Sequence, residues 1–289
     1  MNAPAPHQTW PEDWLSHQSQ AGRQVWAVVD ASADAAQPHV RRLDASSTCT
    51  NLLSHITSDP AALALAPRVT PIESDGHQPA LRTMWQTQTA DEPMLFLIAS
   101  DWPQAMWTQA MRRRMRARFT DGELMLMRWW DARIWWALHD PTISAHGDVQ
   151  AFLAIEAASV WPGRDGRLHT SENRPCDADP LRDETAWPVS DPTFSGLLQL
   201  GHADAVLGIC RSDHAAALAL VPPAERHALA CAQIAWAQAQ GWHSAGDHAI
   251  AFCIAAEVGA DWAEQAEWAE LVAKATASGQ TLRTALAES

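Results

Sequence analysis

The stretch LMLMRWWDARIWWAL, Leu124 to Leu138, is the part of the chain that decides the fold. Its first half is an apolar run typical of a β-strand, so we predict a strand over 124–130 that passes directly into a helix. Arg128, Asp131 and Arg133 stand where the strand gives way to the helix. Arginine forms bidentate pairs with carboxylates, so one interpretation is an internal ion-pair lock that fixes this junction. The alternative is that Arg128 or Arg133 points outward to a partner.

Two pairs of tryptophans flank this charged triplet. In a strand, Trp129 and Trp130 would face opposite sides, so at least one ring would need cover from another element or from a partner. Trp135 and Trp136 raise the same question on the helix. The chain has 16 tryptophans and no tyrosine. Tryptophan and arginine are enriched where interfaces concentrate their binding energy, although a single tryptophan more often fills a core.

Short β-type runs alternate with helical stretches in the N-terminal part of the chain. We predict strands over 25–30, 94–100 and 124–130, and a hairpin within 157–171 that turns at 163–166. A helix that starts near Asp101, with Pro103 in its first turn, places Trp107, Met111 and Met115 on one face. The alternation predicts an α+β fold, in which an α/β-like lobe has a mixed sheet flanked by helices.

A dense basic cluster follows that helix in an otherwise acidic chain. Its members are Arg112, Arg113, Arg114, Arg116 and Arg118. Cations near a helix C-terminus suit the macrodipole, so the cluster is either a solvated face or a dock for an acidic partner segment.

The C-terminal third is predicted to be all-helical. Proline and glycine signals mark helix starts at 191–192 and 222–223, and helices over 247–258 and 261–279. We therefore divide the chain into an N-terminal extension (1–24), the α/β-like lobe (25–173), a linker or surface loop rich in Pro and Asp (174–191) and a helical lobe (192–289).

Composition excludes several classes of function. The net charge of −14 argues against nucleic-acid partners, because neutralising phosphates requires a basic face. The sequence contains no run of 18 apolar residues, so it does not predict a membrane-spanning segment. The first residues also lack the basic and apolar regions of an export signal, so we expect a cytoplasmic protein. Five widely spaced cysteines without a C-x-x-C motif predict reduced thiols and not a zinc site.

A search for catalytic and metal-binding motifs returns little. We find no G-x-S-x-G elbow, phosphate-binding loop or dinucleotide fingerprint, so we expect no enzyme, no catalytic residues, no metal and no cofactor. Two His/Asp sets could be imagined as ligands, but neither has a spacing that fixes metal ligands on one helical face. These sets are His202, Asp204 and His214, and His243, Asp247 and His248.

The order of several motifs resembles the domain-of-unknown-function family DUF4123, whose members are type VI secretion adaptors or effector chaperones. The resemblance covers roughly residues 25–171. VWAVVD (25–30) is similar to the family's (Y/W)-A-(L/V)-(L/V)-D strand, and MRWWDARI (127–134) is similar to its F-R-(F/Y)-(Y/W)-D-P-R-V phrase. The second match departs at Ala132, where the family has proline, which loosens the turn but keeps the charged triplet. The intervening APRVTPIE and the WPGRDGRL hairpin follow the family's order.

The resemblance implies a cytoplasmic, non-catalytic adaptor. Such a protein binds a toxic type VI effector and helps to load it onto the spike, valine-glycine repeat protein G (VgrG). One alternative is an immunity-type or regulatory module that binds a toxin, and another is an uncharacterised metal-dependent hydrolase that uses the His/Asp sets. The candidate partner-binding residues are Arg128, Trp130, Asp131, Arg133, Trp129, Arg112, Arg113 and Arg116.

Overall fold

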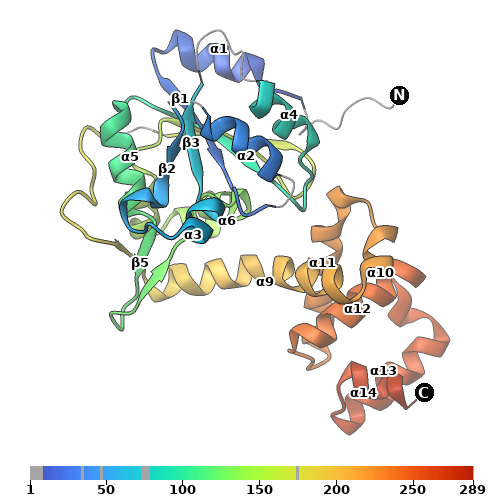
Figure 1. The fold of residues 1–289 in the computed structure, drawn as a ribbon. Helices are drawn as coiled ribbons and strands as arrows, with labels where there is room; N and C mark the ends of the chain where they lie inside the picture. Colours follow the sequence, from blue (N-terminus) through green and yellow to red (C-terminus); the bar gives the residue numbers. More distant parts are fainter. Residues whose placement is uncertain (1–8, 34–35, 46–47, 73–78, 174–175, 289) are drawn as a thin grey trace. The chain divides into compact units, whose positions relative to one another are not determined.

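A computed structural model describes residues 9–33, 36–45, 48–72, 79–173 and 176–288. Its contacts divide the chain into two compact units, Met1–Leu198 and Gln199–Ser289. The first combines sheets with helices and the second is helical, which confirms the predicted fold class (Figure 1). None of the described helices is long and apolar enough to cross a lipid bilayer.

A six-stranded antiparallel sheet is the framework of the first unit. Its strand order is β2-β3-β1-β4-β7-β8, so β8 forms one edge. The strands are β1 (Gln24–Val29), β2 (Thr50–Asn51), β3 (Arg68–Pro71), β4 (Leu95–Ser100), β7 (Ala158–Pro162) and β8 (Leu168–Glu172). β1 and β4 are almost wholly buried, which explains why their sequences are continuous apolar runs and do not alternate.

Helices cover both faces of this sheet. On one face, Trp26 of β1 stacks on Trp107 of α5 at 5.0 Å between ring centroids, and Phe96 of β4 stacks on Trp135 of α6 at 5.0 Å. On the other face, alternate strand residues such as Val25 pack with side chains of α1, α2 and α4. The helical segments of this unit are α1 (Glu12–Gln20), α2 (Gln37–Asp44), η3 (Leu52–His55), α3 (Pro60–Leu65), α4 (Pro79–Thr87), α5 (Gln104–Arg113), α6 (Ala132–Leu138), α7 (Pro141–Ser144) and α8 (Gly147–Leu153).

Local sequence explains where several of these helices begin. Asp59 precedes Pro60, and its carboxylate accepts a hydrogen bond from the Ala61 backbone N–H at 3.0 Å. Asp140 caps α7 in the same way. Aspartate satisfies a free backbone donor, while proline at the first helical position needs none, so each Asp-Pro pair starts a helix.

A second, three-stranded sheet has the order β6-β5-β9. It consists of β5 (Arg116–Arg118), β6 (Leu124–Leu126) and β9 (Trp187–Pro188). β5 and β6 form an antiparallel hairpin, and β9 adds to β5 in parallel. The predicted strand over 124–130 is therefore too long: it ends at Leu126, and a turn leads into α6.

The segment predicted as a linker packs against the first unit. Its described part contributes β9, and Trp187 donates from Nε1 to the Asp148 backbone oxygen at 2.8 Å. Asp179, Leu181 and Val189 are also buried. A run rich in Pro and Asp is typical of an exposed loop, but here the polar residues find partners within the fold.

The second unit is built from packed helices of 3 to 23 residues. They are α9 (Asp191–Asp213, which begins in the first unit), α10 (Ala215–Leu220), α11 (Pro223–Ala239), α12 (Ala245–Val258), η4 (Trp262–Glu264), α13 (Ala266–Ser278) and α14 (Leu282–Ala287). The predicted ends of α12 and α13 at Gly259 and Gly279 agree with the structure, where both glycines have positive φ. Trp236 contacts Trp242 and Trp262 edge-to-face in the core of this unit.

Candidate protein interaction site

The junction before α6 joins the two sequence motifs singled out above. Arg128 donates from Nη2 to Asp30 Oδ2 at 3.0 Å and to Ser32 Oγ at 2.9 Å. Asp30 directly follows β1, and its side chain is buried. Arg128 also lies 3.9 Å from Asp131, so it bridges the end of the central strand and the start of α6.

Asp131 holds the other half of the junction. Its Oδ1 accepts from the Arg133 backbone N–H at 3.0 Å, which caps α6, and from Arg133 Nε at 2.9 Å. Its Oδ2 accepts from Arg133 Nη2 at 2.7 Å. Burial alone would raise the pKa of Asp131, but the hydrogen bonds and charge of Arg133, with the charge of Arg128, hold that pKa below its usual value. The geometry is that of the internal lock.

The two neighbouring tryptophans belong to the core. Trp129 and Trp130 lie in the turn and not on the predicted strand. Both are buried, and their rings meet edge-to-face at 6.1 Å. Trp135 lies 6.2 Å from Trp129, so neither ring of the pair is available to a partner in this conformation.

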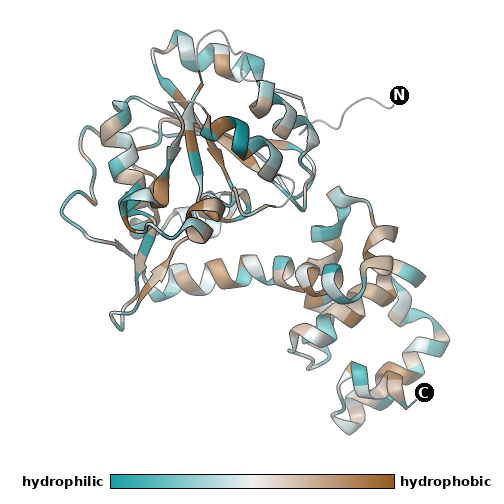
Figure 2. Ribbon diagram, viewed as in Figure 1, coloured by the Kyte–Doolittle hydropathy of each residue, from teal (hydrophilic) through white to brown (hydrophobic). Residues whose placement is uncertain are grey.

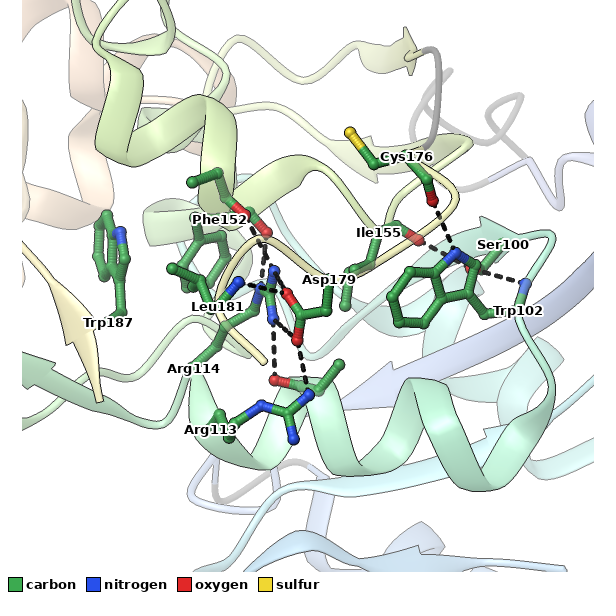
Figure 3. A network of polar contacts seen from close by, with 12 residues as sticks. Ser100, Trp102, Arg113, Arg114, Phe152, Ile155, Cys176, Asp179, Leu181 and Trp187 are labelled. Carbon is green, nitrogen blue, oxygen red and sulfur yellow. Dashed lines mark hydrogen bonds and ion pairs between the residues drawn. The ribbon is translucent and has the colours of Figure 1, made fainter. Parts of the chain in front are cut away.

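Much of the basic cluster is used internally. Arg114 is fully buried and donates from Nη2 to Asp179 Oδ1 at 2.8 Å and from Nε to the Phe152 backbone oxygen at 2.7 Å. Arg113 donates to Asp179 Oδ2 at 2.7 Å. Figure 3 shows both guanidinium groups turned toward this carboxylate. Burial lowers the pKa of Arg114, and Asp179 opposes that shift. Arg113 is therefore part of a structural clamp, together with a partner in the predicted linker.

Arg112 and Arg116 form no ion pair with the carboxylates that the structure describes. Within the described ranges, no carboxylate lies within 4 Å of either guanidinium. Burial is the main factor that lowers the pKa of His55. The positive charges of Arg112 and Arg116 lower this pKa further, which places both arginines near His55. By contrast, Arg118 forms an ion pair with Glu184.

The β5–β6 hairpin carries exposed apolar residues beside Arg116. Leu124, Met125 and Leu126 are 60%, 51% and 53% exposed, and Arg116 pairs in register with Leu126. Figure 2 shows this apolar strand in brown. β6 is the edge of its sheet, and consecutive exposed apolar residues on a sheet edge usually mark an interaction site or an aggregation risk.

One protein family matches the part of the chain that contains these residues. Residues 25–146 match the family described as a domain of unknown function, DUF4123. No curated protein and no solved structure gives a significant match to the chain.

The DUF4123 match includes the lock, the basic cluster and the β5–β6 hairpin, but it stops before β7, β8 and Asp179. Because β7 pairs with β4, the sheet to which the matched residues belong is completed by the residues that follow. The clamp likewise joins Arg114 within the match to Asp179 beyond it.

The His/Asp sets outside the DUF4123 match do not form a metal centre. His202 Nε2 lies 2.8 Å from His248 Nδ1, and His248 Nε2 lies 2.9 Å from the Trp242 backbone oxygen. Ser244 caps α12: its Oγ accepts from the Asp247 backbone N–H at 3.0 Å and donates to Asp247 Oδ2 at 2.6 Å. In the part of the chain that the structure describes, no three His, Cys, Asp or Glu side chains come close enough to hold a metal ion.

Proposed function

We propose that this protein is a non-catalytic adaptor that binds a type VI secretion effector in the cytoplasm and loads it onto the VgrG spike. The DUF4123 match over residues 25–146 supports the family resemblance on which this proposal builds. The resemblance to effector chaperones supplies the two partners, effector and spike.

One observation carries the proposal: the exposed apolar strand β6 at a free sheet edge. A protein that works alone gains nothing from three consecutive exposed apolar residues, which favour aggregation. An adaptor needs such a surface, because burying apolar area on a partner is the main source of binding free energy.

The rigid surroundings of β6 support the same conclusion. The lock at Asp131 fixes the turn that follows the strand, and Met127 donates from its backbone N–H to the Met115 backbone oxygen at 2.8 Å. Preorganisation of this kind reduces the entropy lost on binding. The charges of Arg112 and Arg116 add electrostatic selection for an acidic segment.

Co-expression with the effector and spike encoded beside the gene tests the proposal. We expect the effector to co-purify with the tagged protein and to be less soluble without it. Met125→Asp places a charge on the apolar edge and should reduce recovery of the effector, while Leu220→Ser, which changes a leucine on α10 that is 61% exposed, should not. Absence of both partners from the purified parent protein contradicts the proposal.

The same experiment separates the adaptor from a toxin-binding immunity module. An adaptor leaves the toxic activity of the bound effector unchanged and is needed for its attachment to the spike. An immunity module abolishes that activity and needs no spike.

A further inference from the structure

β8 is one edge of the six-stranded sheet in the first unit. A cavity of about 790 Å³ runs along this strand, between it and the segment from α6 to α8. Its walls include Trp136, Trp161, Asp140, Thr170 and Glu172.

The edge strand offers unused backbone groups at this cavity. Asn173 donates to the Ala157 backbone oxygen, and Gly163 donates to that of Arg167, so the odd-numbered residues exchange the ladder hydrogen bonds with β7. In an antiparallel pair the intervening residues direct their N–H and C=O groups to the other side. Thr170 and Glu172 therefore present their backbone groups outward, and in the described chain no hydrogen bond to these groups occurs.

The wall behind the strand is held by a buried polar network. Trp135 Nε1 donates to Ser159 Oγ at 3.1 Å, and Ser159 Oγ lies 2.8 Å from Ser171 Oγ. Ser171 donates in turn to Glu156, whose carboxylate lies 3.0 Å from His139 Nε2. With these groups paired to one another, the wall is a fixed template that does not need to reorganise when a ligand arrives.

The charge of the cavity selects the ligand. The described residues of its lining include no arginine or lysine, and His139 is already paired with Glu156. Glu172 is mostly exposed, and its Oε1 lies 3.9 Å from His17 Nδ1. Asp140 adds a second carboxylate, whose Oδ1 also caps α7. The Trp136 ring already carries the guanidinium of Arg164, 4.6 Å from its centroid, so the carboxylates and not the indole faces are the groups that a basic side chain would contact.

From these observations we infer that β8 and its cavity bind an extended basic segment of a partner protein, which adds to β8 as a further strand. Its backbone pairs with Thr170 and Glu172, and its arginine or lysine side chains reach Glu172 and Asp140. Strand addition gives affinity through the backbone and specificity through alternate side chains. The site is separate from β6 and does not depend on the identity of the effector.

Binding of short synthetic peptides to the full chain, measured by calorimetry, tests this inference. We expect a peptide of alternating arginine and valine to bind, and its glutamate–valine counterpart and a proline-interrupted version to bind much more weakly. Binding should also slow hydrogen exchange of the backbone amides of Thr170 and Glu172, because they become donors to the added strand.

Two substitutions sharpen the test. Thr170→Pro removes an outward N–H but leaves the ladder to β7 intact, so affinity for the arginine–valine peptide should fall about tenfold, while Thr170→Val should bind as the parent does. Glu172→Gln keeps the backbone and should weaken binding about two- to fivefold, an effect that disappears at high salt. If Thr170→Pro does not fold, the amide exchange and Glu172→Gln carry the test. Failure of the arginine–valine peptide to bind, equal binding of the glutamate–valine peptide or unchanged amide exchange would overturn the inference.

Discussion

The guanidinium of Arg128 donates to the carboxylate of Asp30 at 3.0 Å across 98 residues of sequence. This contact ties the end of the central strand β1 to the turn before α6, and Asp131 continues the tie into the helix. Two motifs that look independent in the sequence therefore form one junction. We expect its disruption to affect stability first and partner binding only as a consequence.

Substitution of Arg128 tests the first half of the junction. Arg128→Ala leaves the buried Asp30 carboxylate without its cation, so the free energy of unfolding should fall by about 1–3 kcal/mol. Arg128→Lys should recover part of that loss. Chemical denaturation measures both, and Arg116→Ala, which removes an exposed arginine, should stay within about 0.5 kcal/mol of the parent. If Arg128→Ala unfolds as the parent does but loses the effector, the outward-docking interpretation is correct.

The pH dependence of stability tests Asp131. Although burial opposes ionisation, Arg133 and Arg128 lower the pKa of this group below 3.8 in the folded state. Because the pKa is lower in the folded state, the ionised carboxylate of Asp131 contributes its full stabilisation at pH values above the pKa of the unfolded state. This contribution is lost as the pH falls through the pKa of the folded state. Asp131→Asn keeps a capping oxygen but cannot ionise, so its deficit relative to the parent should be constant near neutral pH and should shrink below about pH 4. A deficit that does not change with pH would mean that the charge of Asp131 is not what stabilises the junction.

Loss of Asp179 should be more damaging than loss of either junction residue. Asp179→Ala leaves the fully buried Arg114 without its carboxylate, and breaking a buried pair costs about 3–5 kcal/mol. Asp183→Ala, four residues away and exposed, is the matched control. Thermal melting compares the two, and equal melting temperatures would show that the clamp does not hold this segment.

Charge reversal separates the two roles within the basic cluster. Arg112→Glu with Arg116→Glu should leave the fold intact and weaken binding of an acidic partner segment, because neither arginine has an internal carboxylate among the described residues. Arg113→Glu should instead destabilise the protein, because it places a like charge against Asp179. Melting and affinity measurements on the same preparations distinguish these outcomes. Unchanged affinity of the double variant would remove Arg112 and Arg116 from the interface.

Much of the fold follows from local pattern, whereas the partners of charged residues do not. The apolar runs of β1 and β4, the face of α5 that carries Trp107 and the glycine stops of α12 and α13 were predictable because each depends on neighbouring residues. The partner of Arg114 was not, because Asp179 is 65 residues away in a segment of polar composition. The end of β6 at Leu126 was also missed. Asp131 caps α6, which begins at Ala132, and that preference outweighs the β-propensity of Trp129 and Trp130, which lie in the turn between the two elements.

The native mass of the complex recovered when this protein, its neighbouring effector and the VgrG spike are expressed together tests the central claim most directly. We predict a ternary complex that contains all three chains, and its loss in Met125→Asp but not in Leu220→Ser. Recovery of this protein alone, with effector and spike absent or bound only to each other, would contradict the adaptor function.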